Sequence, residues 1–80
     1  MNEIEVKLDH CFSLAFPRMD PGRRAYASVE NTSEWDSLAQ VTLLTLVGEE
    51  FGIEIDFEEF EGATSFAALA SRIGKLSAGA

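Results

Sequence analysis

The sequence predicts an all-α domain: a four-helix bundle with a long loop between the first and second helices and a short third helix. Two observations favour this fold class. In three separate segments, apolar residues recur every three or four positions, as expected for helices that bury one face. Strand-like alternation of apolar and polar residues nowhere extends beyond three positions.

The first helix is expected to end before Pro17, which cannot continue it. Asp20-Pro21-Gly22 then predicts a turn. The rest of the loop is long for a compact domain; we expect a short helical turn near 24–29, with Tyr26 and Val29 fixing the loop to the core. The buried face of the first helix is expected to consist of Ile4, Leu8, Cys11, Phe12 and Phe16.

The second helix has clear ends, with Asp36 as its N-cap and Gly52 just past its last turn. Gly48 lies inside it and costs about 1 kcal/mol relative to Ala. An unusually wide apolar stripe predicts burial against more than one neighbour. The stripe consists of Leu38, Val41, Leu44, Val47 and Phe51, widened by Leu43 and Leu46.

The remaining chain predicts two more helices. After an extended Ile53-Glu54-Ile55, the order Asp-x-x-Glu in residues 56–59 resembles a capping box and predicts the short third helix. Thr64-Ser65 can cap the last helix, whose apolar face would hold Phe66, Leu69, Ala70, Ile73 and Leu76. We expect residues 1–80 to form a single domain, with 77–80 as a frayed tail.

Charge restricts the partners. Six Lys and Arg against fourteen Asp and Glu give a net charge of −8, which disfavours nucleic acid and anionic membranes and favours basic protein surfaces. Nine of the acids fall between Glu34 and Glu61, a segment without a single base. No apolar run approaches the length of a membrane span, and no secretory signal or cysteine pair is present, so we expect a cytoplasmic protein.

Catalytic and metal sites find little support in the sequence. The one histidine, His10, and the one cysteine, Cys11, are neighbours on a helix, so their side chains diverge by about 100° and cannot form a nucleophile pair. Residues 48–59 resemble a calcium loop, but the position that needs glycine is Ile53. We therefore expect neither a metal site nor a catalytic residue.

Ser37 is the residue that remains. Because Asp36 caps the helix, the Ser37 hydroxyl is not needed for capping and can project from the first turn. A phosphate attached there would be favoured by the N-terminal end of the helix dipole. The tripeptide Asp-Ser-Leu is short and common, so taken alone it fits an ordinary solvated serine equally well.

The surroundings of Ser37 resemble the phosphopantetheine attachment region of acyl carrier proteins. Asp36-Ser37-Leu38 opens an amphipathic helix, and the likeness covers 35–73, about half the chain, without a gap. It extends more loosely, by layout, to the first helix and the long loop. The further shared positions are Val41, Leu44, Val47, Glu49-Glu50-Phe51, Ile55, Glu58-Glu59, Thr64 and the last helix as far as Ile73.

This resemblance implies a four-helix acyl-carrier bundle that is not an enzyme. A phosphopantetheinyl transferase would attach 4′-phosphopantetheine covalently to Ser37, beside Asp36 and Leu38, and acyl groups would be carried as thioesters. Further partners would be an acyl-activating enzyme or a synthase, contacted weakly by a monomeric carrier without membrane insertion. The contact residues would be Val41, Thr45, Glu49 and Glu50.

Some residues depart from the pattern of fatty-acid carriers. Ala39 and Thr42 stand where acids are usual, and Trp35 precedes Asp36 where a small or aliphatic residue is common. These departures favour a specialised polyketide, nonribosomal-peptide, saccharide or lipid pathway. Two alternatives stay open: an aminoacyl or peptidyl carrier, although the Gly-Gly typical of those is absent, and an unmodified acidic helical adaptor.

Overall fold

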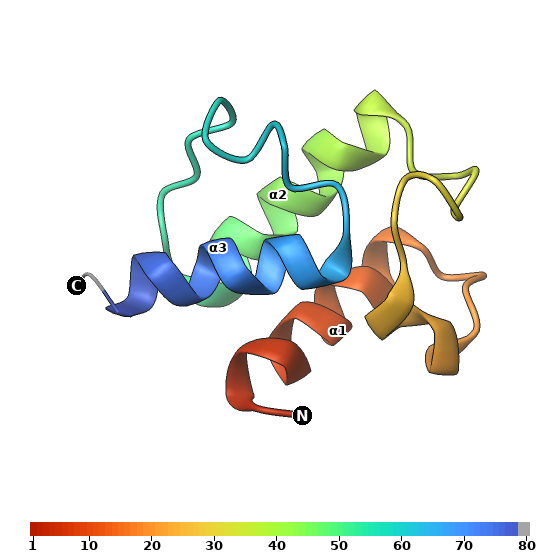
Figure 1. The fold of residues 1–80 in the computed structure, drawn as a ribbon, viewed down its shortest axis with the longest axis horizontal. Coiled ribbons are helices and arrows are strands. Elements are labelled where there is room, and N and C mark those ends of the chain that lie inside the picture. The colour runs from red at the N-terminus through yellow and green to blue at the C-terminus, as the bar shows by residue number, and fades with distance from the viewer. Residues whose placement is uncertain (79–80) are drawn as a thin grey trace.

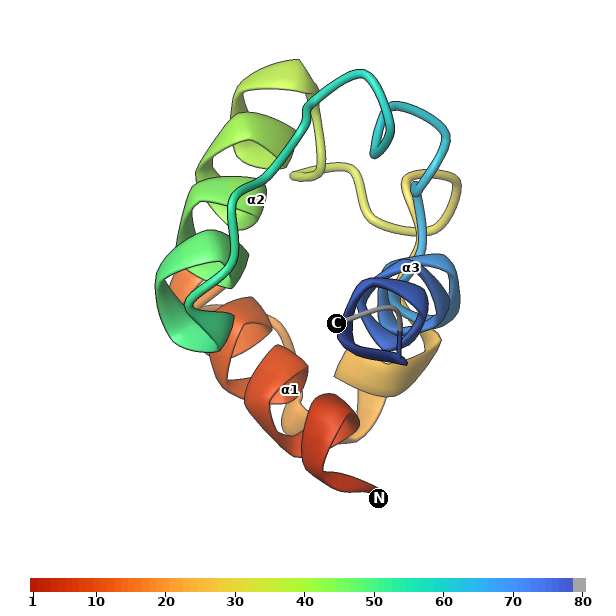
Figure 2. The same ribbon diagram turned by 90° about the vertical axis from the view of Figure 1, so that its left-hand side faces the viewer.

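The fold is an open bundle of helices built around α1. A computed structural model describes residues 1–78, with α1 (Glu3–Ala15), the 3₁₀ helix η1 (Pro21–Tyr26), α2 (Ser37–Phe51) and α3 (Phe66–Ala78). α1 packs against α2, α3 and η1 (Figure 1). The connection from α2 to α3 crosses on the side opposite α1 (Figure 2). The expected all-α class, with its long loop between the first two long helices, is confirmed.

Each long helix begins at a side-chain cap. Asn2 and Glu5 form a reciprocal capping box at α1, and the Asp36 carboxylate accepts the N–H of Ala39 at α2. The Ser65 hydroxyl accepts the N–H of Ala68 at the start of α3. α3 continues through Ala78, and the rest of the tail that was expected to fray, residues 79–80, lies outside the described residues.

The ends of α1 and α2 also follow the sequence. α1 stops two residues before Pro17, and α2 stops at Gly52, which adopts the left-handed conformation with φ of 63°. Gly48 has a packing role as well as a propensity cost. A Cβ there would lie 3.3 Å from the Ile53 carbonyl oxygen and 3.3 Å from Ile55 Cγ1. Glycine therefore lets the chain turn back closely over the end of α2.

Aromatic rings occupy one end of the core. The Phe12 ring lies 5.3 Å from that of Trp35 in an edge-to-face arrangement and 5.2 Å from that of Phe66, and Phe16 also contacts both Phe12 and Trp35. Leu8, Leu43 and their neighbours continue the core between the long helices. The other fully buried side chains are Leu44, Leu69, Ile73, Val47, Cys11 and Phe60.

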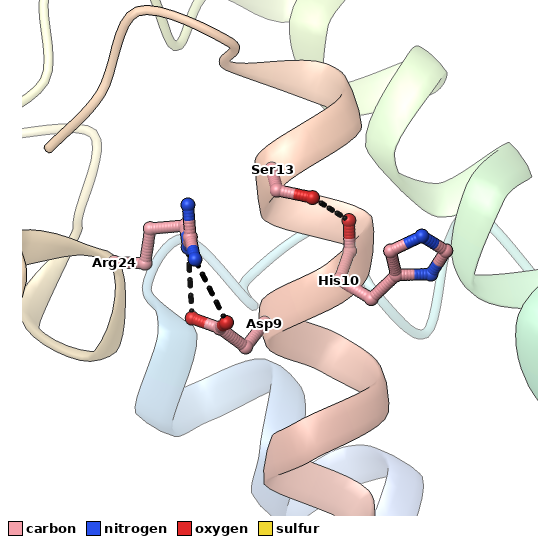
Figure 3. Close-up of polar contacts among 4 residues, drawn as sticks. All are labelled: Asp9, His10, Ser13 and Arg24. Carbon is pink, nitrogen blue, oxygen red and sulfur yellow. Dashed lines mark hydrogen bonds and ion pairs between the residues drawn. The ribbon is translucent and has the colours of Figure 1, made fainter. Parts of the chain in front are cut away.

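The long loop is held by residues other than those expected. Tyr26 is 80% exposed and Val29 is also exposed, so the prediction that they fix the loop to the core is wrong. Ala27 and Met19 are buried instead. Polar contacts do the rest, because Arg24 of η1 forms two hydrogen bonds, of 2.9 and 3.0 Å, with the Asp9 carboxylate on α1 (Figure 3).

The loop also pairs with the segment before α3. The Val29 N–H donates to the Thr64 carbonyl, the Phe66 N–H donates to the Ala27 carbonyl, and an isolated antiparallel bridge joins Ser28 to Ser65. These backbone bonds satisfy groups that a compact loop would otherwise leave unpaired. They place the residues before α2 next to those before α3.

The segment expected to form the short third helix consists of turns. Phe60 N–H bonds the Asp56 carbonyl and Glu61 N–H bonds that of Glu58, but regular helical bonding does not develop over 57–62. The Asp56 carboxylate caps a turn by accepting the N–H of Glu58. Four closely spaced acids and a single buried anchor, Phe60, do not offset the cost of nucleating so short a helix. The short helical element is instead η1, in the preceding loop.

Candidate functional site

Ser37 is the first residue of α2 and its side chain is exposed. The Asp36 carboxylate accepts the Ala39 N–H at 2.9 Å, and the Asp36 carbonyl accepts the Gln40 N–H at 2.9 Å. Capping is thus complete without the Ser37 hydroxyl, for which the described residues supply no hydrogen-bond partner. The sequence prediction that this hydroxyl is displayed at the start of the helix is confirmed by this geometry.

A groove of about 450 Å³ opens beside Ser37, between α2 and the chain that leads to α3. Val41 and Leu44 of α2 face it from one side, and Phe57 from the other. Its lining is mainly apolar with a polar rim at the serine end, a composition typical of small-molecule pockets. The remaining lining residues are Val29, Trp35, Asp36, Gln40, Glu61 and Thr64.

One side-chain amide joins the walls of this groove. The buried Trp35 indole donates its N–H to Gln40 Oε1 at 2.6 Å. Gln40 Nε2 in turn donates to the carbonyl oxygens of Ala63 at 3.2 Å and Phe60 at 3.4 Å. Gln40 therefore connects the residue before the Asp36 cap, the first turn of α2 and the 57–62 turns.

Sequence reasoning missed this connection. Gln40 is a polar residue on an exposed-looking helix position, and Trp35 was considered only as a departure from a family pattern. A usable signal did exist, because a buried indole N–H requires an acceptor and glutamine stands five positions later. Nothing in the sequence, however, indicates that the turns around Phe60 approach Gln40.

The first half of α2 is exposed rather than buried. Leu38 is 75% exposed and Val41 is 49% exposed, so the predicted apolar stripe is buried only from Leu43 onward. The hydroxyls of Thr42 and Thr45 donate to the carbonyls of Leu38 and Val41, which satisfies them within the helix. The result is an uncharged outer surface next to Ser37.

The two acids predicted to contact partners differ in their surroundings. Glu49 is exposed. The Glu50 carboxylate lies 2.6 Å from His10 Nδ1 of α1, and its side chain is only 29% exposed. Glu50 is thus committed to a contact within the protein, which leaves Glu49 as the more available of the two.

His10 and Cys11 form no catalytic pair. Figure 3 shows that Asp9 and His10 leave α1 on opposite sides, one toward Arg24 and the other away from it. Cys11 is buried, and burial, with a smaller contribution from the charge of Glu50, raises the pKa of its thiol to about 11. Hydrogen bonding from Asp9 raises the pKa of Arg24 above its ordinary value.

Searches of the described residues for other kinds of site agree with this. Over 1–78, no three His, Cys, Asp or Glu side chains come together as metal ligands. None of the helices within that range is long and apolar enough to cross a bilayer.

Comparison with known protein families gives one match. A family model described as the phosphopantetheine attachment site matches residues 34–73, which is half of the chain and includes α2, the groove and the start of α3. The group that this family carries is a covalently attached 4′-phosphopantetheine. No significant match was found among curated proteins or among solved structures.

Proposed function

Because the chain belongs to the phosphopantetheine attachment-site family, we propose that it is an acyl carrier protein modified on Ser37. Carrier domains of this family are generally not catalytic, and they work with a phosphopantetheinyl transferase and with synthases. When attached, the group supplies a terminal thiol that holds acyl cargo as a thioester. In our proposal residues 1–80 act as a single monomeric carrier domain.

The observation that carries the proposal is the uncommitted hydroxyl of Ser37 at the start of α2. In the transferase reaction its oxygen would bond to the phosphorus next to the pantetheine portion of coenzyme A. The pyrophosphate bond would break, adenosine 3′,5′-bisphosphate would leave, and the hydroxyl proton would be lost. The phosphodiester formed in this way is an anion, which the unpaired N–H groups of the first helical turn favour.

The residues around Ser37 fit a flexible group attached there. Asp36 keeps the helix start in place through its bond to Ala39, and exposed Leu38 offers an apolar contact beside the serine. The groove lined by Val41, Leu44 and Phe57 is open next to Ser37 and can receive apolar cargo. Burial of cargo in this groove would shield it from water.

Partner enzymes would contact the outer surface of α2. Leu38, Val41 and Thr45 present an uncharged area near Ser37, and Glu49 presents an acid further along the helix. Glu50 lies at the same end, but its contact with His10 makes it a weaker candidate. A matching partner surface would be apolar near its active-site entrance and basic toward the Glu49 side, and the contact would weaken with added salt.

The neutral first half of α2 supports a role in a specialised biosynthetic pathway rather than in general fatty-acid synthesis. Both an acyl and an aminoacyl or peptidyl cargo are compatible with the site. Loading assays separate them: the acyl proposal predicts that malonyl or fatty acyl groups are transferred to the modified protein in preference to amino acids.

The proposal is tested by incubating the purified protein with coenzyme A, Mg²⁺ and a broad-specificity transferase and weighing it intact. We expect one phosphopantetheine adduct on the wild type, none on Ser37→Ala, and an unchanged adduct on Ser33→Ala. Ser33 is a matched control because it is an exposed serine in the neighbouring loop. An unmodified wild type, or an adduct that persists on Ser37→Ala, would contradict it.

A further inference from the structure

The orientation of the Gln40 amide is fixed by its partners. An indole N–H can only donate, so the atom that faces Trp35 Nε1 at 2.6 Å must be the amide oxygen. The two protons on Nε2 then face the carbonyls of Ala63 and Phe60. The amide thus has an acceptor half directed at Trp35 and a donor half directed at the turns.

Each half of the amide holds a different part of the groove. Trp35 is 4% exposed and packs against Phe12 and Phe16 of α1, so the acceptor half ties the first turn of α2 to the core. The donor half holds the chain at Phe60 and Ala63, next to the groove-lining residues Phe57 and Glu61. These turns have no regular helical bonding, so Gln40 is a main restraint on their distance from α2.

We propose that Gln40 is a specificity-determining residue, because its donor half sets the width of the groove beside Ser37 and so limits the length of acyl cargo that the groove accepts. This inference rests on the proposed function, since it needs cargo attached at Ser37. Cargo that fits leaves the bonds to Phe60 and Ala63 in place. Longer cargo either stays in solvent or must break them.

The test measures thermal stability as a function of cargo length. The protein is modified on Ser37 from a series of straight-chain acyl-coenzyme A donors, and modification of each sample is verified by intact mass. Cargo bound only by the folded state raises the melting temperature. In the wild type we expect the melting temperature of the acyl forms to rise with chain length and then to level off when the groove is full.

Two variants separate the halves of the amide. Gln40→Glu keeps an acceptor for Trp35 but loses both donors to the turns, and we expect its melting temperature to level off at a longer chain than in the wild type. Trp35→Phe removes the indole N–H but leaves both donors, and we expect it to level off at the wild-type length. A role of Gln40 in stability alone would lower all melting temperatures equally without moving the levelling point.

A wild-type measurement covers the case in which Gln40→Glu fails to fold. We expect the Gln40 Nε2 protons to exchange slowly with solvent in the unmodified protein and with short cargo, and to lose this protection beyond the levelling point. A wild-type levelling point in Gln40→Glu, or Nε2 protection that is equal at every chain length, overturns the inference. Absence of any adduct on Ser37 would contradict the proposed function instead, so the two failures are distinguishable.

Discussion

His10 Nδ1 of α1 lies 2.6 Å from Glu50 Oε1 in the last turn of α2. Close by, Lys7 Nζ of α1 lies 5.7 Å from the centre of the Phe51 ring. Together with the buried Val47, these contacts fasten the second half of α2 to α1. The first half, which begins with Ser37, has no such contacts on its outer side, so the attachment residue is displayed by a helix that is anchored at its far end.

The His10–Glu50 pair should contribute modestly to stability. The His10 side chain is 59% exposed, and exposed pairs of this kind are typically worth below about 1 kcal/mol. A double-mutant cycle with His10→Ala and Glu50→Gln, measured by urea unfolding, should give a small favourable coupling free energy. The same cycle with Glu49→Gln should give none, and equal coupling for both acids would contradict the contact.

Leu38 and Leu44 should respond differently to truncation, although both belong to the apolar pattern of α2. Leu38→Ala should change the free energy of unfolding by less than about 0.5 kcal/mol because the side chain is exposed. Leu44→Ala should cost about 2–5 kcal/mol because the side chain is buried.

The two variants should separate again in the modification assay. Leu38→Ala should slow attachment at Ser37 while it stays folded, because the exposed leucine is offered to the transferase. The comparison requires the initial rate of adduct formation and urea unfolding on the same samples. Attachment to Leu38→Ala at the wild-type rate would remove Leu38 from the proposed contact surface.

Gly48 and Gly74 should give opposite results when replaced by alanine. A Cβ at Gly74 would make ordinary contact with Ile4 Cδ1 at 3.8 Å, so Gly74→Ala should stabilise the protein by about 1 kcal/mol through helix propensity. A Cβ at Gly48 would be crowded at 3.3 Å by a backbone oxygen and a side chain, so Gly48→Ala should destabilise it. Equal stabilisation of both variants in urea unfolding would show that the chain after α2 yields easily.

The Cys11 thiol should be unreactive in the folded protein at neutral pH. Burial raises its pKa from 9.0 to about 11, so the nucleophilic thiolate is scarce, and the sulfur is also inaccessible. A thiol reagent should detect no thiol in the folded unmodified protein, and one after unfolding or after attachment of the phosphopantetheine arm. Rapid reaction of the folded unmodified protein would contradict the buried position.

The same pKa predicts how stability depends on alkaline pH. The folded state holds the thiol proton more tightly than the unfolded chain, so its contribution is fully present below pH 9.0 and is lost as pH rises toward about 11. Cys11→Ala should reduce this loss, measured as the free energy of unfolding across that range. An identical alkaline dependence in the variant would assign the loss to other groups.

Local chemistry explains why much of this fold is predictable from the sequence. Asp36, Gly52 and Ser65 mark helix ends because capping and left-handed geometry depend on single residue types. The position of Ser37 followed from Asp36 alone. These features require no knowledge of what lies elsewhere in the chain.

The features that were missed depend on contacts between distant segments. Helical periodicity indicates that Leu38 and Val41 share a face with Leu44, but not that the core ends before reaching them. Similarly, Tyr26 looks like a better anchor than Ala27, yet the close approach of the loop to α3 selects the small residue. The Trp35–Gln40 bond and the turns that replace the short third helix depend on tertiary packing in the same way.

The most direct test of the account is to locate the adduct on the modified chain. Cleavage after glutamate yields a fragment spanning 35–49, in which Ser37 is the only serine. After incubation with transferase and coenzyme A, we expect the mass of one phosphopantetheine on this fragment and none on the fragments that contain Ser33 or Ser65. An adduct on another fragment, or an unmodified 35–49 fragment from a protein shown to be folded, would contradict the assignment of Ser37.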